Sequence, residues 1–341
     1  MRLILHIGTA KTGTSSIQAS MHLHSETWKR AGVLYPTPPK RKTNHNLLAV
    51  LCQEEHRYPR EFLQGGSSPS DVRHLAERWW RDMTSELKNS RGSTVVLSGE
   101  YLFGMNEGEV ERLAEVLIPL FDEIEVVVYF RDPASYYLSF VQQRVRAAAV
   151  LPSPAKFRLR AEICVRRHAE ALRSTVTARS FDRTALIGGD IVTDFTVSVL
   201  GISPEEAASF TVENQNASFS AEAMCIMQMV RRHVHPDQED RRTAASLRLM
   251  SELRQLGRDI PQTVPRLRPE ISAAIARSHE RDLEYLAAQF SIRFDHIVEP
   301  LAADDPDPDG WESGELTTLL EVEPESLSRT VAHLLVRASF A

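Results

Sequence analysis

Cysteine is scarce in this sequence, with three residues in a chain of 341. Cys52, Cys164 and Cys225 lie far apart, and no two of them form a CxxC pair. Disulfide frameworks and zinc sites depend on evenly paired or closely spaced cysteines. We therefore expect reduced thiols in a cytoplasmic protein, with neither a disulfide framework nor a bound metal.

Long apolar runs are missing as well. No stretch approaches the roughly 18 apolar residues that a membrane-spanning helix requires. The first residues, MRLILHIG, contain an apolar run of only about five residues, whereas the core of a signal peptide has about 7–15. We expect the protein to remain in the cytoplasm and not to insert stably into a membrane.

Positive charge is not in excess. Lysine and arginine number 40 against 46 aspartates and glutamates, and the formal net charge is -6. Because nucleic-acid-binding domains usually carry a basic surface, we expect no nucleic-acid partner. Hydrophobic residues make up 42% and charged residues 25%, which is typical of a globular protein with one large domain or two smaller ones.

Short apolar runs rich in β-branched residues alternate with helical patterns in the first part of the chain. Strands are expected at 2–7, 94–97 and 124–130, and helices at 70–89 and 110–120. The run IEVVVYF at 124–130 is almost uninterrupted and apolar, which is typical of a strand buried on both faces of a parallel sheet. The alternation predicts a three-layer α/β fold with helices on both faces of the sheet.

The rest of the sequence becomes mainly helical. A strand at 175–181 and a helix at 191–200 precede helical patterns at 220–234, 238–257 and 267–289. The acidic, proline-rich segment 302–310 indicates a loop. We expect a single domain made of an α/β core at 1–217, a mainly helical extension at 218–300 and a tail at 301–341.

A glycine-rich loop at residues 8–16, GTAKTGTSS, joins the first strand to a helix. Glycine lets the backbone approach a ligand, and successive N–H groups of such a loop can cradle an anion. The helix N-terminus adds partial positive charge, and Lys11 adds a full charge. Thr14, Ser15 and Ser16 supply N-cap chemistry, and the loop hydroxyls are further donors. The loop predicts a phosphate site; the alternative is a glycine turn with a solvated lysine.

The position of the lysine separates this loop from that of ordinary ATP-binding proteins. Their GxxxxGK[ST] loop places a lysine directly after the second glycine. Here Thr14 follows Gly13, and Lys11 lies before that glycine. This spacing argues against a standard kinase or ATPase.

A second phosphate contact is expected at Arg131. The residues YFRDP at 129–133 mark the end of a buried strand and the start of a helix that should run to about Ala149. Ligands of open α/β sheets bind beyond the carboxyl ends of the strands, and a guanidinium suits a phosphate. Ser139 lies about two turns into the helix. The alternative is that Arg131 pairs with Asp132 or caps the strand end.

These two motifs together resemble the bacterial type of the sulfotransferase family that uses 3′-phosphoadenosine 5′-phosphosulfate (PAPS). HIGTAKTGTSSIQ is similar to the 5′-phosphosulfate loop of the family, and the spacing of Arg131 and Ser139 matches its 3′-phosphate motif. The pieces at 181–195 and 214–224 are also similar to bacterial members. The resemblance implies a fold of the P-loop type, a small-molecule or carbohydrate acceptor, and no metal.

The resemblance also implies roles for individual residues. Lys11 would stabilise the bridging oxygen as it gains charge, and the 5′-phosphate would be held by the backbone of Thr12, Gly13, Thr14, Ser15 and Ser16. The family closes a basic segment near its C-terminal part over the 3′-phosphate. Arg231–Arg232 and Arg241–Arg242 are candidates for that segment, although an exposed helix face explains them equally well.

A hydroxyl acceptor needs a general base near the site. Glu100 follows the strand at 94–97, and some carbohydrate-modifying relatives use a glutamate. His45, in a polar NHN loop before an apolar helix, is the rival, because histidine titrates near neutral pH. A surface carboxylate and a polar residue at a helix start are the structural alternatives. Two other functions stay open: a nucleotide-dependent kinase of the P-loop class, and a nucleotide-binding scaffold without catalysis.

Overall fold

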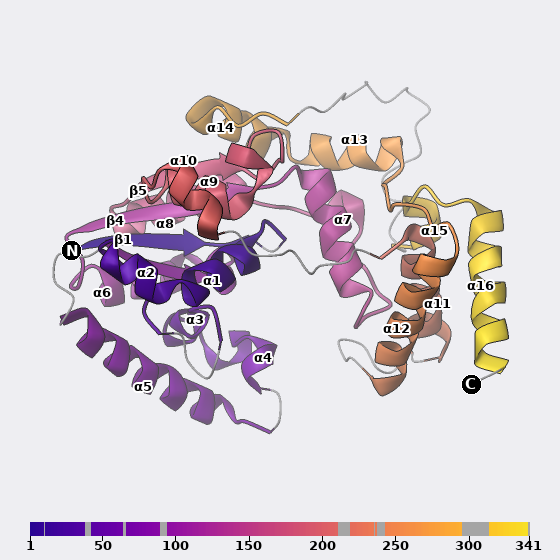
Figure 1. Ribbon diagram of the computed structural model, residues 1–341, viewed down its shortest axis with the longest axis horizontal. Coiled ribbons are helices and arrows are strands. Elements are labelled where there is room, and N and C mark those ends of the chain that lie inside the picture. The colour runs from indigo at the N-terminus through magenta and orange to yellow at the C-terminus, as the bar shows by residue number, and fades with distance from the viewer. Residues whose placement is uncertain are drawn as a thin grey trace. The chain divides into compact units, whose positions relative to one another are not determined.

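The structure, a computed structural model, describes residues 1–9, 11–37, 42–63, 66–88, 94–210, 219–234, 236, 243–294 and 314–339. The chain folds into two compact units (Figure 1). The first unit consists of residues 1–131, 160–214 and 281–293, and the second of residues 132–159, 215–280 and 294–341. Neither unit is therefore one continuous stretch of sequence.

The first unit is built on a five-stranded sheet in the order β2-β3-β1-β4-β5. The strands are β1 (Arg2–Ile7), β2 (Val33–Leu34), β3 (Thr94–Gly99), β4 (Glu123–Phe130) and β5 (Thr175–Ser180). All neighbouring strands are parallel, so their carboxyl ends lie at one edge of the sheet. β1 lies between β3 and β4, and its apolar residues are fully buried because helices cover both faces.

Helices cover the two faces of the sheet (Figure 1). On one face, a hydrophobic cluster joins the strands to α1 (Thr14–Leu23), α2 (Ser25–Arg30) and α9 (Ile191–Ser198). On the other face, the middle helix is α6 (Glu107–Leu117), which packs against α3 (Leu47–Cys52) and against α8 (Ala161–Leu172). The helix α8 also lies against β4 and β5. The amphipathic α5 (Pro69–Lys88) packs on α3.

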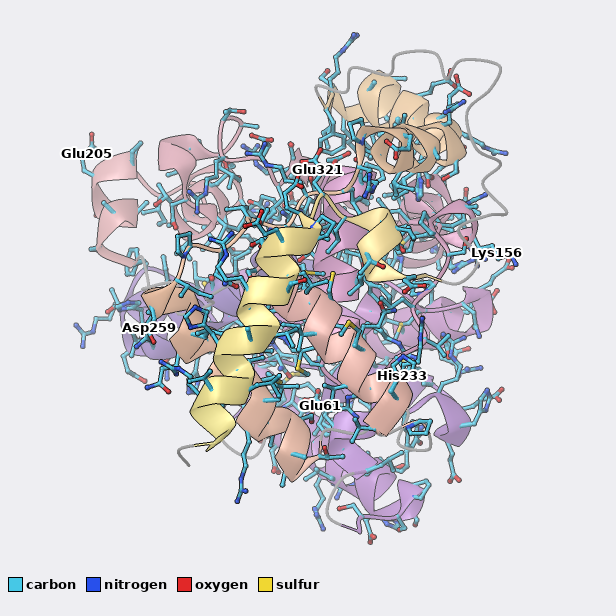
Figure 2. All side chains as sticks on the ribbon, turned by 90° about the vertical axis from the view of Figure 1, so that its right-hand side faces the viewer. Glu61, Lys156, Glu205, His233, Asp259 and Glu321 are labelled. Carbon is cyan, nitrogen blue, oxygen red and sulfur yellow. The ribbon has the colours of Figure 1, made fainter. Side chains whose placement is uncertain are left out.

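The second unit is helical. Its longer helices are α7 (Pro133–Arg144), α11 (Ala221–Val234), α12 (Ala244–Asp259), α13 (Pro269–Ser278) and α16 (Pro324–Ser339). Their apolar side chains share one core cluster. Figure 2 shows α16 lying along α11 and α12. The buried carboxylate of Glu222 on α11 accepts hydrogen bonds from Ser326 Oγ of α16 at 2.7 Å and from Thr263 Oγ1 at 2.6 Å, which joins these segments.

The fold class expected from the sequence is confirmed, since a parallel sheet lies between two layers of helices. The strands expected at 2–7, 94–97, 124–130 and 175–181 correspond to β1, β3, β4 and β5. β1, β3 and β4 are buried apolar runs in the sheet interior, whereas β5 is a partly buried edge strand that pairs with β4. The helix expected at 70–89 is α5.

Other expectations need correction. The helix after Pro133 ends at Arg144, well before Ala149. The region 267–289 contains two helices, α13 and α14 (Glu280–Phe290), because His279 leaves the helical conformation at φ -115 and ψ 10. The helix α8 was not among the helices expected from the sequence. The acidic segment 302–310 and the pair Arg241–Arg242 lie outside the described residues. Over the ranges that the structure does describe, no helix combines the length and apolarity needed to cross a bilayer.

Candidate functional site

The glycine-rich loop, Glu100 and Arg131 follow three adjacent strands. The loop follows β1, Glu100 follows β3 and Arg131 follows β4, so all three lie at the carboxyl edge of the sheet in the first unit. The N–H of Gly8 donates to the Gly99 carbonyl at 3.2 Å, which ties the loop to the end of β3. On the other side, Arg131 Nη1 lies 3.5 Å from the carbonyl oxygen of Lys11. The two regions singled out in the sequence therefore meet.

Buried threonine hydroxyls brace the loop from within. The Thr9 hydroxyl, 1% exposed, donates to the Tyr129 carbonyl of β4 at 2.9 Å. The Thr12 and Thr14 hydroxyls both donate to the Thr9 carbonyl, at 2.9 and 3.2 Å. The sequence suggested that loop hydroxyls serve as donors to a ligand. In the structure, the hydroxyls of Thr12 and Thr14 instead fix the loop's own shape.

Two of the described residues of the loop have left-handed backbone conformations. Lys11 has φ 65 and Gly13 has φ 75. A side chain at Gly13 would also be crowded, since a Cβ there would come within 2.9 Å of Ile191 and Phe181. Left-handed residues in a turn direct neighbouring N–H groups toward one point, as anion-binding nests do. This backbone therefore has the form of an anion cradle.

The helix α1 begins at Thr14, with Gly13 as its N-cap. The sequence assigned N-cap chemistry to Thr14, Ser15 and Ser16, and this is corrected: no side chain caps the helix. The N–H groups of Ser16 and Ile17 turn back to the Gly13 carbonyl, at 2.9 and 3.2 Å. Between described residues, no hydrogen bond takes up the N–H groups of Thr14 or Ser15, which leaves them for an external acceptor.

Glu100 opens a short 3-10 turn, η2 (Glu100–Leu102), at the end of β3. Its backbone N–H donates to Asn46 Oδ1 at 2.9 Å. Burial, followed by the charge of Glu61, raises the pKa of the Glu100 carboxyl, while the charge of Lys11 acts in the opposite direction. The carboxyl is thus close enough to Lys11 and Glu61 to interact with both, which suits a group that takes up a proton at the site.

His45, the other candidate base, is held by the backbone through its side chain. It is fully buried, and its Nδ1 accepts the N–H of Ser98 at 3.0 Å while Nε2 donates to the Pro36 carbonyl at 2.9 Å. Burial lowers the pKa of this imidazole to about 4. Both ring nitrogens are engaged by the backbone, and the ring braces the end of β3. Of the two candidate bases, the geometry favours Glu100.

Arg131 lies beside an aromatic ring as well as beside the loop. Its Cζ is 5.9 Å from the centroid of Phe181, which follows β5 and donates its N–H to the Phe130 carbonyl at 2.7 Å. The carboxylate of Asp132 caps α7, accepting the Ser135 N–H at 2.7 Å. Ser139 is a partly buried residue of α7 and belongs to the second unit.

A buried ionic network supports the helix next to the loop. Asp194 of α9 is fully buried and accepts two hydrogen bonds from Arg179 of β5, from Nε at 2.6 Å and from Nη2 at 2.8 Å. The Tyr129 hydroxyl donates to the same carboxylate at 2.8 Å. Since Ile191 at the start of α9 packs against Gly13, this network holds one wall of the loop.

Sequence reasoning missed Asn46 and Glu61. Asn46 is next to the candidate His45, but its partners are Glu61, 15 residues away, and Glu100, 54 residues away. No local pattern links residues at such separations.

The described ranges hold no group of three or more His, Cys, Asp or Glu side chains arranged to bind a metal ion.

No protein-family model matches this chain, and no curated protein matches its sequence. Among solved structures, it is similar to a sulfotransferase from Alicyclobacillus acidocaldarius, with 17% identity and a TM-score of 0.34 over 72% of this chain and 98% of that chain. It is also similar to a structure of the PezAT chromosomal toxin-antitoxin system of Streptococcus pneumoniae, with 11% identity and a TM-score of 0.31 over 74% of this chain and 86% of that chain. Similarity at this level does not identify a family.

Proposed function

We propose that this chain is a PAPS-dependent sulfotransferase that acts on a hydroxyl or amine of an acceptor, with carbohydrates among the candidates. The observation that carries the proposal is the meeting of Arg131 with the Lys11 loop at one sheet edge. A donor with phosphate groups at both ends of its ribose requires two separate cationic contacts close together. The loop backbone suits the 5′ end, and the guanidinium suits the 3′ end.

The reaction would need positioning and charge stabilisation rather than a metal. The acceptor oxygen would form a bond to sulfur as the bond from sulfur to the bridging phosphate oxygen breaks. Glu100 would take the proton from the acceptor hydroxyl, and Lys11 would stabilise the negative charge that collects on the bridging oxygen. The N–H groups from Thr12 to Ser16 would bind the 5′-phosphate.

The 3′-phosphate would be bound by Arg131, whose planar guanidinium can donate two parallel hydrogen bonds. Ser139 stays a prediction from its spacing to Arg131 in the sequence. His45 is the less favoured base, because its two nitrogens already bond to the backbone.

Transfer of labelled sulfate from PAPS to an extract of candidate acceptors tests the proposal directly. Thermal melting with adenosine 3′,5′-bisphosphate or ATP tests the nucleotide separately. A ligand at 100 times its Kd stabilises the folded state by about 2.7 kcal/mol. We expect the bisphosphate to stabilise the chain more than ATP does. Preferential stabilisation by ATP would favour a kinase, and bisphosphate binding without transfer would favour a scaffold.

A further inference from the structure

The side chain of Asn46 bridges two acidic residues. It is 3% exposed, its Oδ1 accepts the backbone N–H of Glu100 at 2.9 Å, and its Nδ2 donates to Glu61 Oε1 at 3.2 Å. The bridge fits closely, because a Cβ added at Gly99 would come within 3.2 Å of Asn46 Oδ1. The backbone that carries Glu100 is therefore coupled to the carboxylate of Glu61 through one buried amide.

The second oxygen of Glu61 is also bound. Lys42 Nζ lies 3.1 Å from Glu61 Oε2, with 43% of the Lys42 side chain and 28% of the Glu61 side chain exposed. Glu61 belongs to α4 (Arg60–Leu63), an element remote in sequence from the candidate site, and is labelled in Figure 2. With one oxygen bonded to the Asn46 amide and the other to the Lys42 ammonium, the carboxylate is held in place.

We infer that Asn46 and Glu61 are positioning residues for Glu100: Asn46 fixes the backbone of the base, and the charge of Glu61 makes that base stronger. This inference rests on the proposed function for its catalytic meaning. A base works best when its proton affinity is matched to the working pH. An ordinary exposed glutamate is a weak base at neutral pH, and a neighbouring negative charge strengthens it.

The groups that face Glu100 come from three elements. Lys11 of the loop favours the ionised carboxyl, and Glu61 of α4 opposes ionisation. Tyr101 of η2 is neutral, because burial and the charges of Glu61 and Glu100 raise its pKa to about 12. Lys42 is paired with Glu61 and moderates its effect. Of the carboxylates in these contacts, Glu61 is the one that a single substitution can neutralise without touching the reacting groups.

The deciding experiment is a carboxyl titration of Glu100 in the full chain, by NMR with carbon-13-labelled glutamate. The signal of Glu100 is identified by its loss in Glu100→Gln. Glu61→Gln keeps an oxygen to accept the Asn46 hydrogen bond and removes the negative charge together with its ion pair to Lys42, so we expect the Glu100 titration to move to lower pH. Glu61→Asp retains the charge, so the Glu100 carboxyl in this variant should titrate at a pH close to that in the parent protein.

The matched control is Glu55→Gln, the same change at an exposed residue of η1 (Glu55–Arg57). It should leave the Glu100 titration unmoved. Asn46→Asp keeps the acceptor for the Glu100 N–H but places a further carboxylate beside it, and should move the titration to higher pH. An unmoved Glu100 titration in Glu61→Gln, or an equal movement in Glu55→Gln, would overturn the inference.

Turnover provides the catalytic readout. In Glu61→Gln, the acidic limb of the kcat/KM profile should move to lower pH, so the ratio of acidic to neutral activity rises by about 3- to 10-fold. Asn46→Ala should lower kcat by about 10- to 100-fold with the KM for PAPS unchanged. An absence of transfer in the parent protein would contradict the proposed function, while the carboxyl titration would still decide the coupling of Glu61 to Glu100.

Discussion

Arg131 Nη1 lies 3.5 Å from the carbonyl oxygen of Lys11, although the two residues are 120 positions apart in the chain. The contact is at the long limit of a hydrogen bond, so it contributes little energy. It shows instead that the two residues lie side by side. It brings a guanidinium to the glycine-rich loop from the end of the neighbouring strand. A ligand with two phosphate groups would find a separate cationic partner for each.

The ammonium of Lys11 is expected to be essential for turnover. Lys11→Ala should lower kcat by about 10²- to 10³-fold and weaken stabilisation by adenosine 3′,5′-bisphosphate, because in the proposed mechanism it removes the charge that would meet the leaving oxygen. Labelled-sulfate transfer and melting measure the two effects.

Backbone strain at Lys11 provides the control for that experiment. Because Lys11 has φ 65, glycine fits this position with less strain than alanine does. Lys11→Gly should lose as much turnover as Lys11→Ala while being the more stable variant. Unchanged turnover in either variant would show that the loop is not the donor site.

Arg131 should recognise the 3′-phosphate specifically. Arg131→Ala should weaken binding of adenosine 3′,5′-bisphosphate by about 1.5–3 kcal/mol, since a charge-assisted contact is lost. Binding of adenosine 5′-monophosphate, which has no 3′-phosphate, serves as the control and should change little. Calorimetric titration of both nucleotides checks this, and an equal loss for the two would contradict a 3′-specific role.

Gly13 is expected to tolerate no side chain. Gly13→Ala meets both a left-handed φ of 75 and contacts of 2.9 Å with Ile191 and Phe181. The matched control is Gly32→Ala, whose φ is 79 but whose added Cβ would meet nothing within 4 Å. Urea denaturation should show about 1–2 kcal/mol of destabilisation for the control and more for Gly13→Ala. Equal losses would mean that crowding against Ile191 and Phe181 is not important.

The sequence predicts the sheet well, because the buried strands are continuous apolar runs and need no distant information. It also predicts which loops share an edge, since parallel strands end together. It does not predict the use of the side chains there. Thr12 and Thr14 brace the loop, and His45 bonds to the backbone at Ser98 and Pro36, through hydrogen bonds that depend on tertiary structure. The bridge from Asn46 to Glu61 and Glu100 leaves no periodic trace in the sequence for the same reason.

Glu100 is expected to support activity while lowering the stability of the fold at neutral pH. If it is the general base, Glu100→Gln should lower kcat by about 10²- to 10⁴-fold while sparing nucleotide binding. The same change should raise the melting temperature at neutral pH. Burial and the charge of Glu61 raise the pKa of this carboxyl in the folded state, so folding favours its protonated form. Glutamine is neutral at every pH and avoids the cost of ionisation.

The sign of the pH dependence follows from that raised pKa. The protonated Glu100 carboxyl contributes favourably to the free energy of unfolding. This contribution is fully present below the unfolded-state pKa of glutamate and is lost as the pH rises through the folded-state pKa. The melting temperature of Glu100→Gln relative to the parent protein should therefore increase from acidic to neutral pH. Glu55→Gln, at an exposed position, should show no such trend. A difference that is constant with pH would mean that Glu100 ionises in the folded protein as it does in the unfolded chain, and it would remove the electrostatic reason for choosing this residue as the base.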